Sequence, residues 1–393
     1  MGIKEINKVK DSELLFYLAY VIWTVNFVIN QTYYSDILPV SEIYNILRVV
    51  IYLLLYTKFI IDNPYNKKIL SFIIIMGLVF ITTINSKLVS IMEIFLFIYS
   101  ARNIDIKRII KISLILHISL MIIIVVSSFI GIIENNVWYR EDNSIRYGIG
   151  YRYTTFLANY FFHIVLMYVF LKELKNVTLV ECISIIIINK VIYYYTDTKA
   201  VFYLVNLAII MLYIYSKNNV ILEKTFIQKN ICKYCFPIFA LITILITKSY
   251  TSSNYILNIM NKVLTGRLSL GKLAYDQYGI SILGQPIIWN TGNIGVDEWG
   301  IQVYNYVDSS YVNILLNFGL VILIFICIGF VIVGKEAVKM NNINLYIVLI
   351  FIALHSITDP QLIELGYNPF ILMISVIFGY TQCNKNTLET DYL

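Results

Sequence analysis

Charged side chains are scarce in this chain. Asp, Glu, Lys and Arg make up 14% of the 393 residues, whereas hydrophobic residues make up 59%. A soluble domain is about one quarter charged, because water must solvate most of its surface. The shortage of charge excludes an ordinary soluble domain. It predicts an all-α polytopic membrane protein, since helices satisfy their own backbone groups inside a bilayer.

Motifs of several enzyme and transporter classes are also missing. The chain has no Walker loop, no Gly-rich dinucleotide fingerprint and no His-Glu-x-x-His metal motif. It therefore offers no support for ATP-driven transport or zinc protease chemistry, and we expect neither a cofactor nor a metal site. The net charge of +6 is explained by cytoplasmic Lys and Arg that orient helices, so we expect no nucleic-acid partner.

Cysteine is sparse as well, with five residues in the whole chain. None falls in the segments that we place outside the membrane, so no disulfide framework is predicted. Cys232 and Cys235 have the spacing of half a redox or metal motif. Because no second pair accompanies them, we favour a reading without chemistry there.

Long apolar runs are abundant instead. Since a spanning helix needs about 20 apolar residues, we predict about twelve spans in one membrane domain, residues 1–393. With the N-terminus inside, most of the 30 Lys and Arg residues fall in cytoplasmic segments, which predicts that both termini are cytoplasmic. The predicted spans lie near residues 14–30, 37–61, 69–84, 88–100, 109–133, 154–171, 179–195, 200–215, 235–247, 309–333, 343–357 and 368–380.

Two outer segments carry clustered cations against this trend. Long loops cross the membrane regardless of charge, so one reading is that these cations are solvated. The other reading is an anion site, because the planar Arg fork matches phosphate oxygens. The smaller segment, 134–153, holds Arg140, Arg146 and Arg152, and the larger one, 248–308, holds Lys248, Lys262, Arg267 and Lys272.

The larger segment reads as two amphipathic helices on the outer surface or over the bundle. Apolar residues at 256, 259, 260, 263 and 264 have helical spacing, and Ser252-Ser253 offers a Ser cap. A second helix follows Gly266-Arg267 and stops at Gly279. Arg267 thus lies at a helix N-terminus, where unpaired N–H groups and the guanidinium would suit a diphosphate. The alternative is an Arg that anchors the turn or meets a lipid headgroup.

Further candidates lie in the smaller loop and in the second span. Arg146 and Arg152 flank two Gly and two Tyr, which fits an anion site with Tyr151 stacked on a sugar, or an interfacial belt. Arg48 lies inside the second predicted span, where an ionisable residue is a functional candidate by default. The alternative for Arg48 is snorkelling, or pairing with Glu42 or Glu93.

Polar residues also mark the outer ends of the tenth and eleventh predicted spans. Asp308 precedes Ser309-Ser310-Tyr311 and is read as a helix N-cap, a general base or a ligand of a sugar hydroxyl. His355 and Asp359 fit a proton relay or a sugar site, or form a polar turn before Pro360.

Several of these patches together resemble the Wzy-type O-antigen and capsular polysaccharide polymerases. The resemblance covers most of the chain in layout and a few short patches in residues. At one position where related families often carry an Arg, this chain has Lys199, and residues 152–155 lack a Pro-Asn often seen there. The patches are Asn45-Ile46-Leu47-Arg48, residues 146–151, Leu264-Thr265-Gly266-Arg267-Leu268, Tyr278-Gly279, Leu283-Gly284-Gln285, Val307-Asp308-Ser309-Ser310-Tyr311 and residues 315–320.

The resemblance implies a fold like that of the O-antigen ligases, in a bacterial inner (plasma) membrane. It implies transfer of a growing glycan from undecaprenyl diphosphate onto the non-reducing end of an incoming lipid-linked repeat unit, at the outer face. The implied partners are undecaprenyl-diphosphate-linked oligosaccharide and membrane lipid, with a chain-length regulator and a flippase as further candidates.

On this reading we expect Arg267 and Arg146 at the diphosphate, supported by Arg152 and Lys199. Asp308 is the expected base or hydroxyl ligand, because glycosyl transfer needs a stabilised leaving group and a proton acceptor. We expect Tyr151 and Tyr311 to stack on sugar. Two alternatives stay open. One is an O-antigen ligase, which uses a different acceptor, and the other is a lipid-linked oligosaccharide flippase, which is a transporter.

Overall fold

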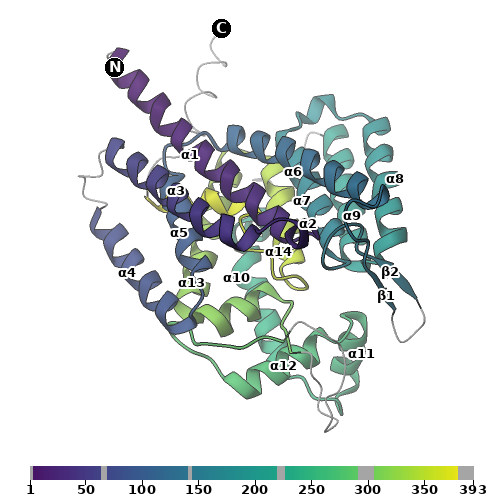
Figure 1. Cartoon of the computed structure of the whole chain (residues 1–393). Helices are drawn as coiled ribbons and strands as arrows, with labels where there is room; N and C mark the ends of the chain where they lie inside the picture. The colour runs from purple at the N-terminus through teal and green to yellow at the C-terminus, as the bar shows by residue number, and fades with distance from the viewer. Residues whose placement is uncertain (1–2, 63–68, 140–143, 219–225, 291–304, 379–393) are drawn as a thin grey trace.

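The computed structural model describes the chain except residues 1–2, 63–68, 140–143, 219–225, 291–304 and 379–393 (Figure 1). It is mostly helical, as predicted. The elements are α1 (Ile3–Asn30), α2 (Tyr34–Ile37), α3 (Val40–Ile61), α4 (Ile69–Ser86), α5 (Ser90–Ser100), α6 (Ile106–Phe129), β1 (Val137–Tyr139), β2 (Ile145–Tyr147), α7 (Phe156–Leu171), η1 (Leu174–Asn176), α8 (Leu179–Thr196), α9 (Lys199–Lys217), α10 (Phe226–Lys248), α11 (Tyr255–Val263), α12 (Arg267–Tyr278), α13 (Ser310–Lys339), α14 (Ile343–His355) and η2 (Pro369–Phe378).

Within the described residues, seven helices are long and apolar enough to cross a membrane: α1, α3, α6, α8, α9, α10 and α13. Five shorter apolar helices, α4, α5, α7, α14 and η2, lie among them. The prediction of a helical membrane protein is confirmed in this sense. The number of twelve spans stays a prediction, because the shorter helices fall below the length that a straight crossing needs.

Exposure along the outer helices fits a bilayer. Apolar side chains on α3, α4 and α8 lie open at the periphery, for example Ile46 at 69%, Leu70 at 62% and Val180 at 74%. In water such surfaces would favour aggregation, whereas lipid tails solvate them. Polar side chains gather inside instead, where helices bond to one another.

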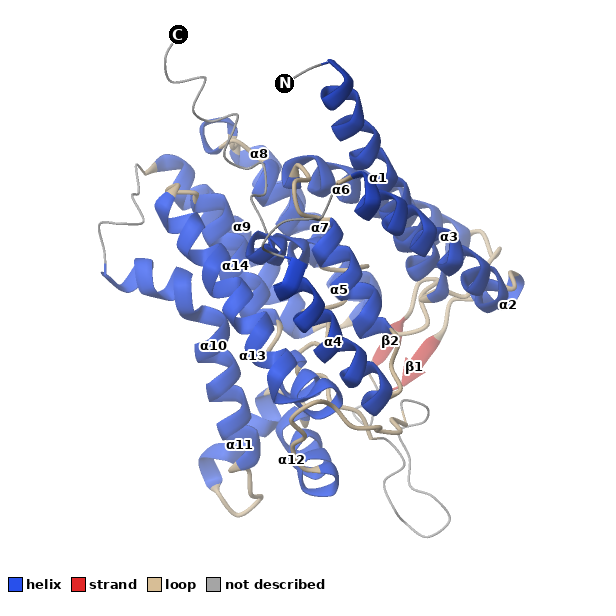
Figure 2. Ribbon diagram, turned by 90° about the vertical axis from the view of Figure 1, so that its left-hand side faces the viewer, coloured by secondary structure: helices blue, strands red, loops and turns tan. Residues whose placement is uncertain are grey.

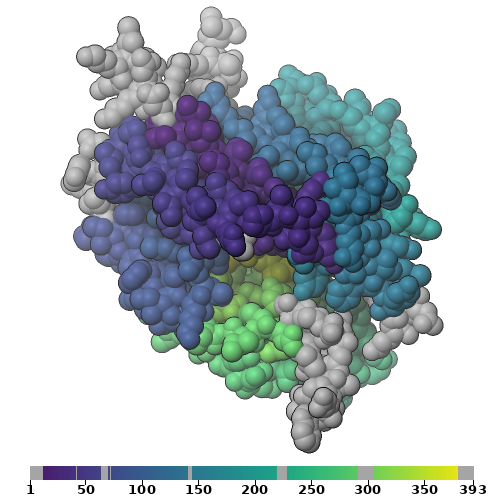
Figure 3. All heavy atoms as spheres, viewed as in Figure 1, coloured from purple at the N-terminus to yellow at the C-terminus, as the bar shows by residue number. Residues whose placement is uncertain are grey.

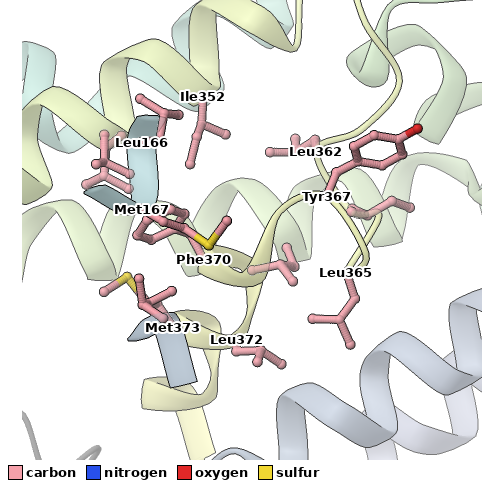
Figure 4. Packing of buried hydrophobic residues seen from close by; sticks show 14 of the residues in the cluster. Leu166, Met167, Ile352, Leu362, Leu365, Tyr367, Phe370, Leu372 and Met373 are labelled. Atoms are coloured by element: carbon pink, nitrogen blue, oxygen red, sulfur yellow. The ribbon is translucent and has the colours of Figure 1, made fainter. Parts of the chain in front are cut away.

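The core lies where α7, α14 and η2 pack together. Leu166 and Met167 of α7 meet Ile352 of α14 and Phe370 and Met373 of η2 (Figure 4). The connection from α14 to η2, residues 356–368, passes through this core, and Leu362 and Leu365 are buried. The centre of the molecule therefore combines α7 with the C-terminal elements α14 and η2.

The two ends of the bundle differ. The start of α1 lies at one end in both views, while α11 and α12 lie at the opposite end (Figures 1 and 2). The predicted break between the two loop helices is confirmed, since α11 ends at Val263 and α12 begins at Arg267. The expected Ser cap is wrong: the side chain of Asn254 accepts from the N–H of Leu257. Gly279 ends α12 as predicted.

Helix α13 is broken at Gly319, and the segment after α12 binds at the break. Gly319 has φ 86°, and the freed N–H groups of Leu320 and Val321 donate to the carbonyls of Ser281 and Ile282 at 3.0 and 3.2 Å. A Cβ on Gly319 would lie 2.5 Å from the Ile282 oxygen, so no larger residue fits. The segment that follows α12 therefore packs into the bundle rather than only lying over it.

Segment 134–153 contains an unpredicted hairpin. Strands β1 and β2 pair antiparallel, with Trp138 opposite Arg146. Arg140 of the same segment lies outside the described residues.

Candidate functional site

Arg267 is the first residue of α12, and a sharp turn sets its direction. Thr265 and Gly266 both have positive φ, 52° and 85°, which reverses the chain between α11 and α12. The Arg267 Nε donates to the Thr358 carbonyl at 2.6 Å, and Nη1 donates to the Leu264 carbonyl at 3.3 Å and to the Thr265 hydroxyl. The side chain stays 19% exposed. These hydrogen bonds therefore fix the guanidinium in place, while part of it remains accessible to a ligand.

Asp308 lies beside this guanidinium. Its Oδ2 is 3.5 Å from Arg267 Nε, and its side chain is 28% exposed. Burial raises the pKa of the Asp308 carboxyl to about 6, with Asp359 adding to the rise and Arg267 opposing it. The interpretation of Asp308 as an N-cap is wrong, because Ser309 occupies the N-cap position of α13. A carboxyl with this pKa is poised for proton transfer near neutral pH.

A buried layer lies beneath this pair. His355 Nε2 lies 3.5 Å from Asp359 Oδ2 and 3.2 Å from Asn159 Oδ1. The Asn159 amide nitrogen donates to Asp359 Oδ1 at 3.3 Å. His355 and Asp359 are only 2% and 5% exposed. Both side chains are too buried to contact a large ligand, so they support Arg267 and Asp308 from beneath.

The start of α13 joins the two layers. The Ser310 hydroxyl donates to the Asp359 carbonyl at 2.5 Å and accepts from the Leu362 N–H at 3.1 Å. We call Arg267, Asp308, His355 and Asp359 the arginine–carboxylate cluster. Its members come from α12, the segment before α13, α14 and the connection after α14, so only the folded chain brings them together.

Arg146 and Arg152 of segment 134–153 have other partners. Arg146 donates through Nε to the Thr196 carbonyl at 2.6 Å and through Nη2 to the Thr198 hydroxyl at 3.3 Å, at the turn between α8 and α9. Arg152 donates to the Ser35 hydroxyl at 2.6 Å and pairs with Asp36. Lys199 is exposed at the start of α9.

These contacts separate two groups that we expected to form one site. Strand β2, which carries Arg146, and helix α12, which Arg267 begins, lie apart in both views (Figures 1 and 2). The structure brings Arg267, Asp308, His355 and Asp359 together. Arg146 contacts the turn between α8 and α9 instead, and Arg152 contacts Ser35 and Asp36.

Both tyrosines expected to stack on sugar are buried. Tyr151 is 0% exposed and packs against Tyr160 with ring centroids 5.4 Å apart. Tyr311 is also 0% exposed, and its hydroxyl donates to the Ala353 carbonyl at 2.9 Å. Their ring faces are covered by the core, so we withdraw the stacking role for both residues.

Arg48 belongs to a separate network around the buried Glu93. Its Nε lies 2.7 Å from Glu93 Oε1, and its guanidinium lies 4.4 Å from the Tyr44 ring centre. Glu93 also accepts from the hydroxyls of Tyr44 and Tyr52 and from the Trp23 indole N–H. Of the two pairing partners considered, Glu93 is the one that the structure shows. The network joins α1, α3 and α5.

One residue of interest was missed by sequence reasoning. Glu364 lies in the connection between α14 and η2, and burial raises the pKa of its carboxyl to about 7. The signal was present, because Glu364 is the only charged residue between Asp359 and Lys385.

A metal centre finds no support among the residues that the structure describes, where no group of three or more His, Cys, Asp or Glu side chains could hold an ion. The cluster's own cation, Arg267, is the group available to neutralise an anion.

Comparisons with known proteins identify no relative. No protein-family model, no curated protein and no solved structure matches this chain.

Proposed function

We propose that the protein is a membrane glycosyltransferase that polymerises lipid-linked oligosaccharide units into O-antigen or capsular polysaccharide of the cell envelope. The growing glycan leaves undecaprenyl diphosphate and joins the non-reducing end of an incoming lipid-linked unit. The observation that carries the proposal is the pairing of a partly open Arg267 with Asp308, whose carboxyl pKa is raised to about 6.

This pair supplies what the reaction requires. In the transfer, a hydroxyl oxygen of the acceptor sugar attacks the anomeric carbon of the donor, and the bond from that carbon to the diphosphate breaks. Arg267 donates hydrogen bonds to the departing diphosphate, and Asp308 accepts the hydroxyl proton. His355 and Asn159 hold Asp359, whose negative charge helps to raise the pKa of Asp308.

The location follows from the same reading. We place the protein in the bacterial inner (plasma) membrane with both termini cytoplasmic and the cluster at the outer face. The position of α12 at the end of the bundle opposite the start of α1 supports this placement (Figures 1 and 2). Cytoplasmic Lys and Arg supply the orientation.

The test is complementation of a strain that lacks the gene with Arg267→Ala and Arg267→Lys. We expect Arg267→Ala to lose long polysaccharide at normal protein level and Arg267→Lys to restore at most part of it, because lysine lacks the planar fork. Lys272→Ala is the matched control, since Lys272 lies on the same helix and pairs only locally with Asp276 at 2.6 Å. Persistence of long chains with Arg267→Ala would refute the assignment.

The phenotype also separates the alternatives. Loss of a polymerase leaves single repeats on the final acceptor, whereas loss of a ligase leaves polymer on undecaprenyl diphosphate. Loss of a flippase leaves lipid-linked units at the cytoplasmic face. We expect the first pattern.

A further inference from the structure

The connection between α14 and η2 exposes one carboxyl from an otherwise buried stretch. Among the ten residues 361–370, all are buried except Glu364, which is partly exposed. The same connection supplies Thr358, which accepts from Arg267, and Asp359. Glu364 is thus presented by the segment that forms one side of the arginine–carboxylate cluster.

The backbone around Glu364 is tightly held. Its N–H donates to the Gln361 carbonyl at 3.2 Å, and its carbonyl accepts from the N–H groups of Tyr367 and Asn368 at 2.9 and 2.8 Å. The Asn368 amide nitrogen donates to the Leu362 carbonyl at 2.7 Å. A carboxyl on such a fixed turn is preorganised rather than free to seek a partner.

No cation neutralises this carboxyl among the described residues, and the structure assigns it no hydrogen-bond partner. Burial is the cause of its raised pKa, about 7. The titratable groups that face this turn are Tyr160 from α7, Tyr367 from the turn itself and His117 from α6, which bonds to the Gly366 carbonyl. A half-buried, unpaired carboxyl costs stability, and a ligand that donates hydrogen bonds to it would offset that cost.

Further acceptors in the same segment also lack partners. The side-chain oxygens Gln361 Oε1 and Asn368 Oδ1 are buried, at 4% and 0% exposure of their residues, and have no hydrogen-bond partner among the described residues. Because both oxygens are buried, a ligand cannot reach them, and Glu364 is the acceptor of this stretch that reaches the surface. A carboxylate accepts hydrogen bonds, and a ligand rich in hydroxyl groups donates them.

The surface is open here. Between the N-terminal elements, drawn purple, and the green segment that includes α12 and α13, the space-filling view is hollowed, and yellow atoms of the C-terminal part lie at its floor (Figure 3). The connection between α14 and η2 belongs to that part. Arg267 donates to Thr358 at the start of that connection, so a ligand held at Arg267 lies beside it.

We propose that Glu364 forms the acceptor subsite, where its carboxylate accepts hydrogen bonds from hydroxyl groups of the incoming sugar unit. This inference rests on the proposed function and assigns different parts of the substrates to Arg267 and Glu364. Arg267 binds the diphosphate that leaves the donor, and Glu364 binds the sugar of the incoming unit. We therefore expect substitutions of the two residues to have different effects on the affinity for ligands with and without sugar.

The experiment compares two probes on purified protein in liposomes. One is undecaprenyl diphosphate, and the other is the lipid-linked oligosaccharide extracted from a strain that lacks the gene. We expect Glu364→Gln to bind undecaprenyl diphosphate like the wild type and the lipid-linked oligosaccharide about tenfold or more weakly, as a lost charged hydrogen bond requires. Arg267→Ala weakens binding of both probes.

Two controls guard against indirect effects. Glu173→Gln changes an exposed carboxyl that pairs with Lys175 at 3.4 Å, and it should bind both probes normally. Melting temperature in detergent checks folding, and Glu364→Asp, which keeps the charge on a shorter side chain, should restore part of the sugar-dependent affinity and be used if Glu364→Gln does not fold.

The outcomes separate the two proposals. If Glu364→Gln or Glu364→Asp binds the oligosaccharide as tightly as the wild type while the wild type polymerises it, the acceptor subsite is refuted and the proposed function stands. If the wild type forms no polymer from the extracted units and Arg267→Ala binds undecaprenyl diphosphate normally, the proposed function is refuted and the acceptor subsite with it.

Discussion

Arg267 Nε and Asp308 Oδ2 lie 3.5 Å apart, although 40 residues separate them in the chain. The turn at Thr265 and Gly266 directs the guanidinium inward, and the start of α13 places the carboxyl beside it. An incoming diphosphate would compete with Asp308 for the donors of Arg267. This competition would release the Asp308 carboxylate from Arg267 when the substrate binds. Asp308 would then be free to accept the proton of the acceptor hydroxyl.

Asp308→Asn should reduce the rate of polymerisation by at least about 100-fold, because it removes the proton acceptor and keeps the shape of the side chain. In the wild type the rate should fall as the pH drops through about 6, since Asp308 then takes up a proton. The check is the initial rate in proteoliposomes between pH 5 and 8. A wild-type rate that stays flat across this range would remove Asp308 from the mechanism.

Gly319→Ala should destabilise the protein by about 2 kcal/mol or more, because it adds a Cβ at positive φ against the Ile282 carbonyl. The segment that follows α12 would lose its place on α13, and polymer length should fall as well. Gly77→Ala is the matched control, since no atom lies within 4 Å of a Cβ there. Melting temperature in detergent measures both variants, and equal values would contradict the account of the broken helix.

Glu93→Ala should cost about 3 kcal/mol or more, since it leaves Arg48 without its ion partner and the Trp23 N–H without an acceptor. Tyr52→Phe removes a single hydrogen bond of 3.2 Å and should cost about 1 kcal/mol. The yield and melting temperature of the purified variants give the comparison. If Arg48→Met keeps normal stability but loses polymer, Arg48 binds substrate and its pairing with Glu93 is secondary.

Arg152→Ala and Asp36→Asn form a further matched pair. The Arg152–Asp36 ion pair is partly exposed, at 38% and 54%, so its loss should change stability by less than about 1 kcal/mol. If Arg152 supports diphosphate binding, Arg152→Ala shortens the polymer and Asp36→Asn does not. Equal polymer length in both variants would leave Arg152 with a local structural role alone.

Part of this arrangement was predictable from the sequence. The break at Gly266-Arg267 and the stop at Gly279 follow from local rules, and both are confirmed. Local rules failed where tertiary contacts decide. Asp308 looks like an N-cap, yet its carboxylate lies beside Arg267. The break at Gly319 exists because residues 281–285 bind there, and no local sequence pattern predicts it.

Burial explains the remaining differences. Tyr151 and Tyr311 have the residue type of sugar platforms, but only the packing of α7 and α14 reveals that both are fully covered. Glu364 drew no attention in the sequence because its importance depends on what fails to pair with it. A missing partner can be recognised only when the neighbours are known.

The central claim is tested most directly by supplying purified protein in proteoliposomes with the extracted lipid-linked oligosaccharide and measuring product length by gel. We predict chains of many repeats and release of undecaprenyl diphosphate with the wild type, and single units only with Arg267→Ala. Units that remain single with the wild type, or that cross the bilayer without being joined, would contradict the account.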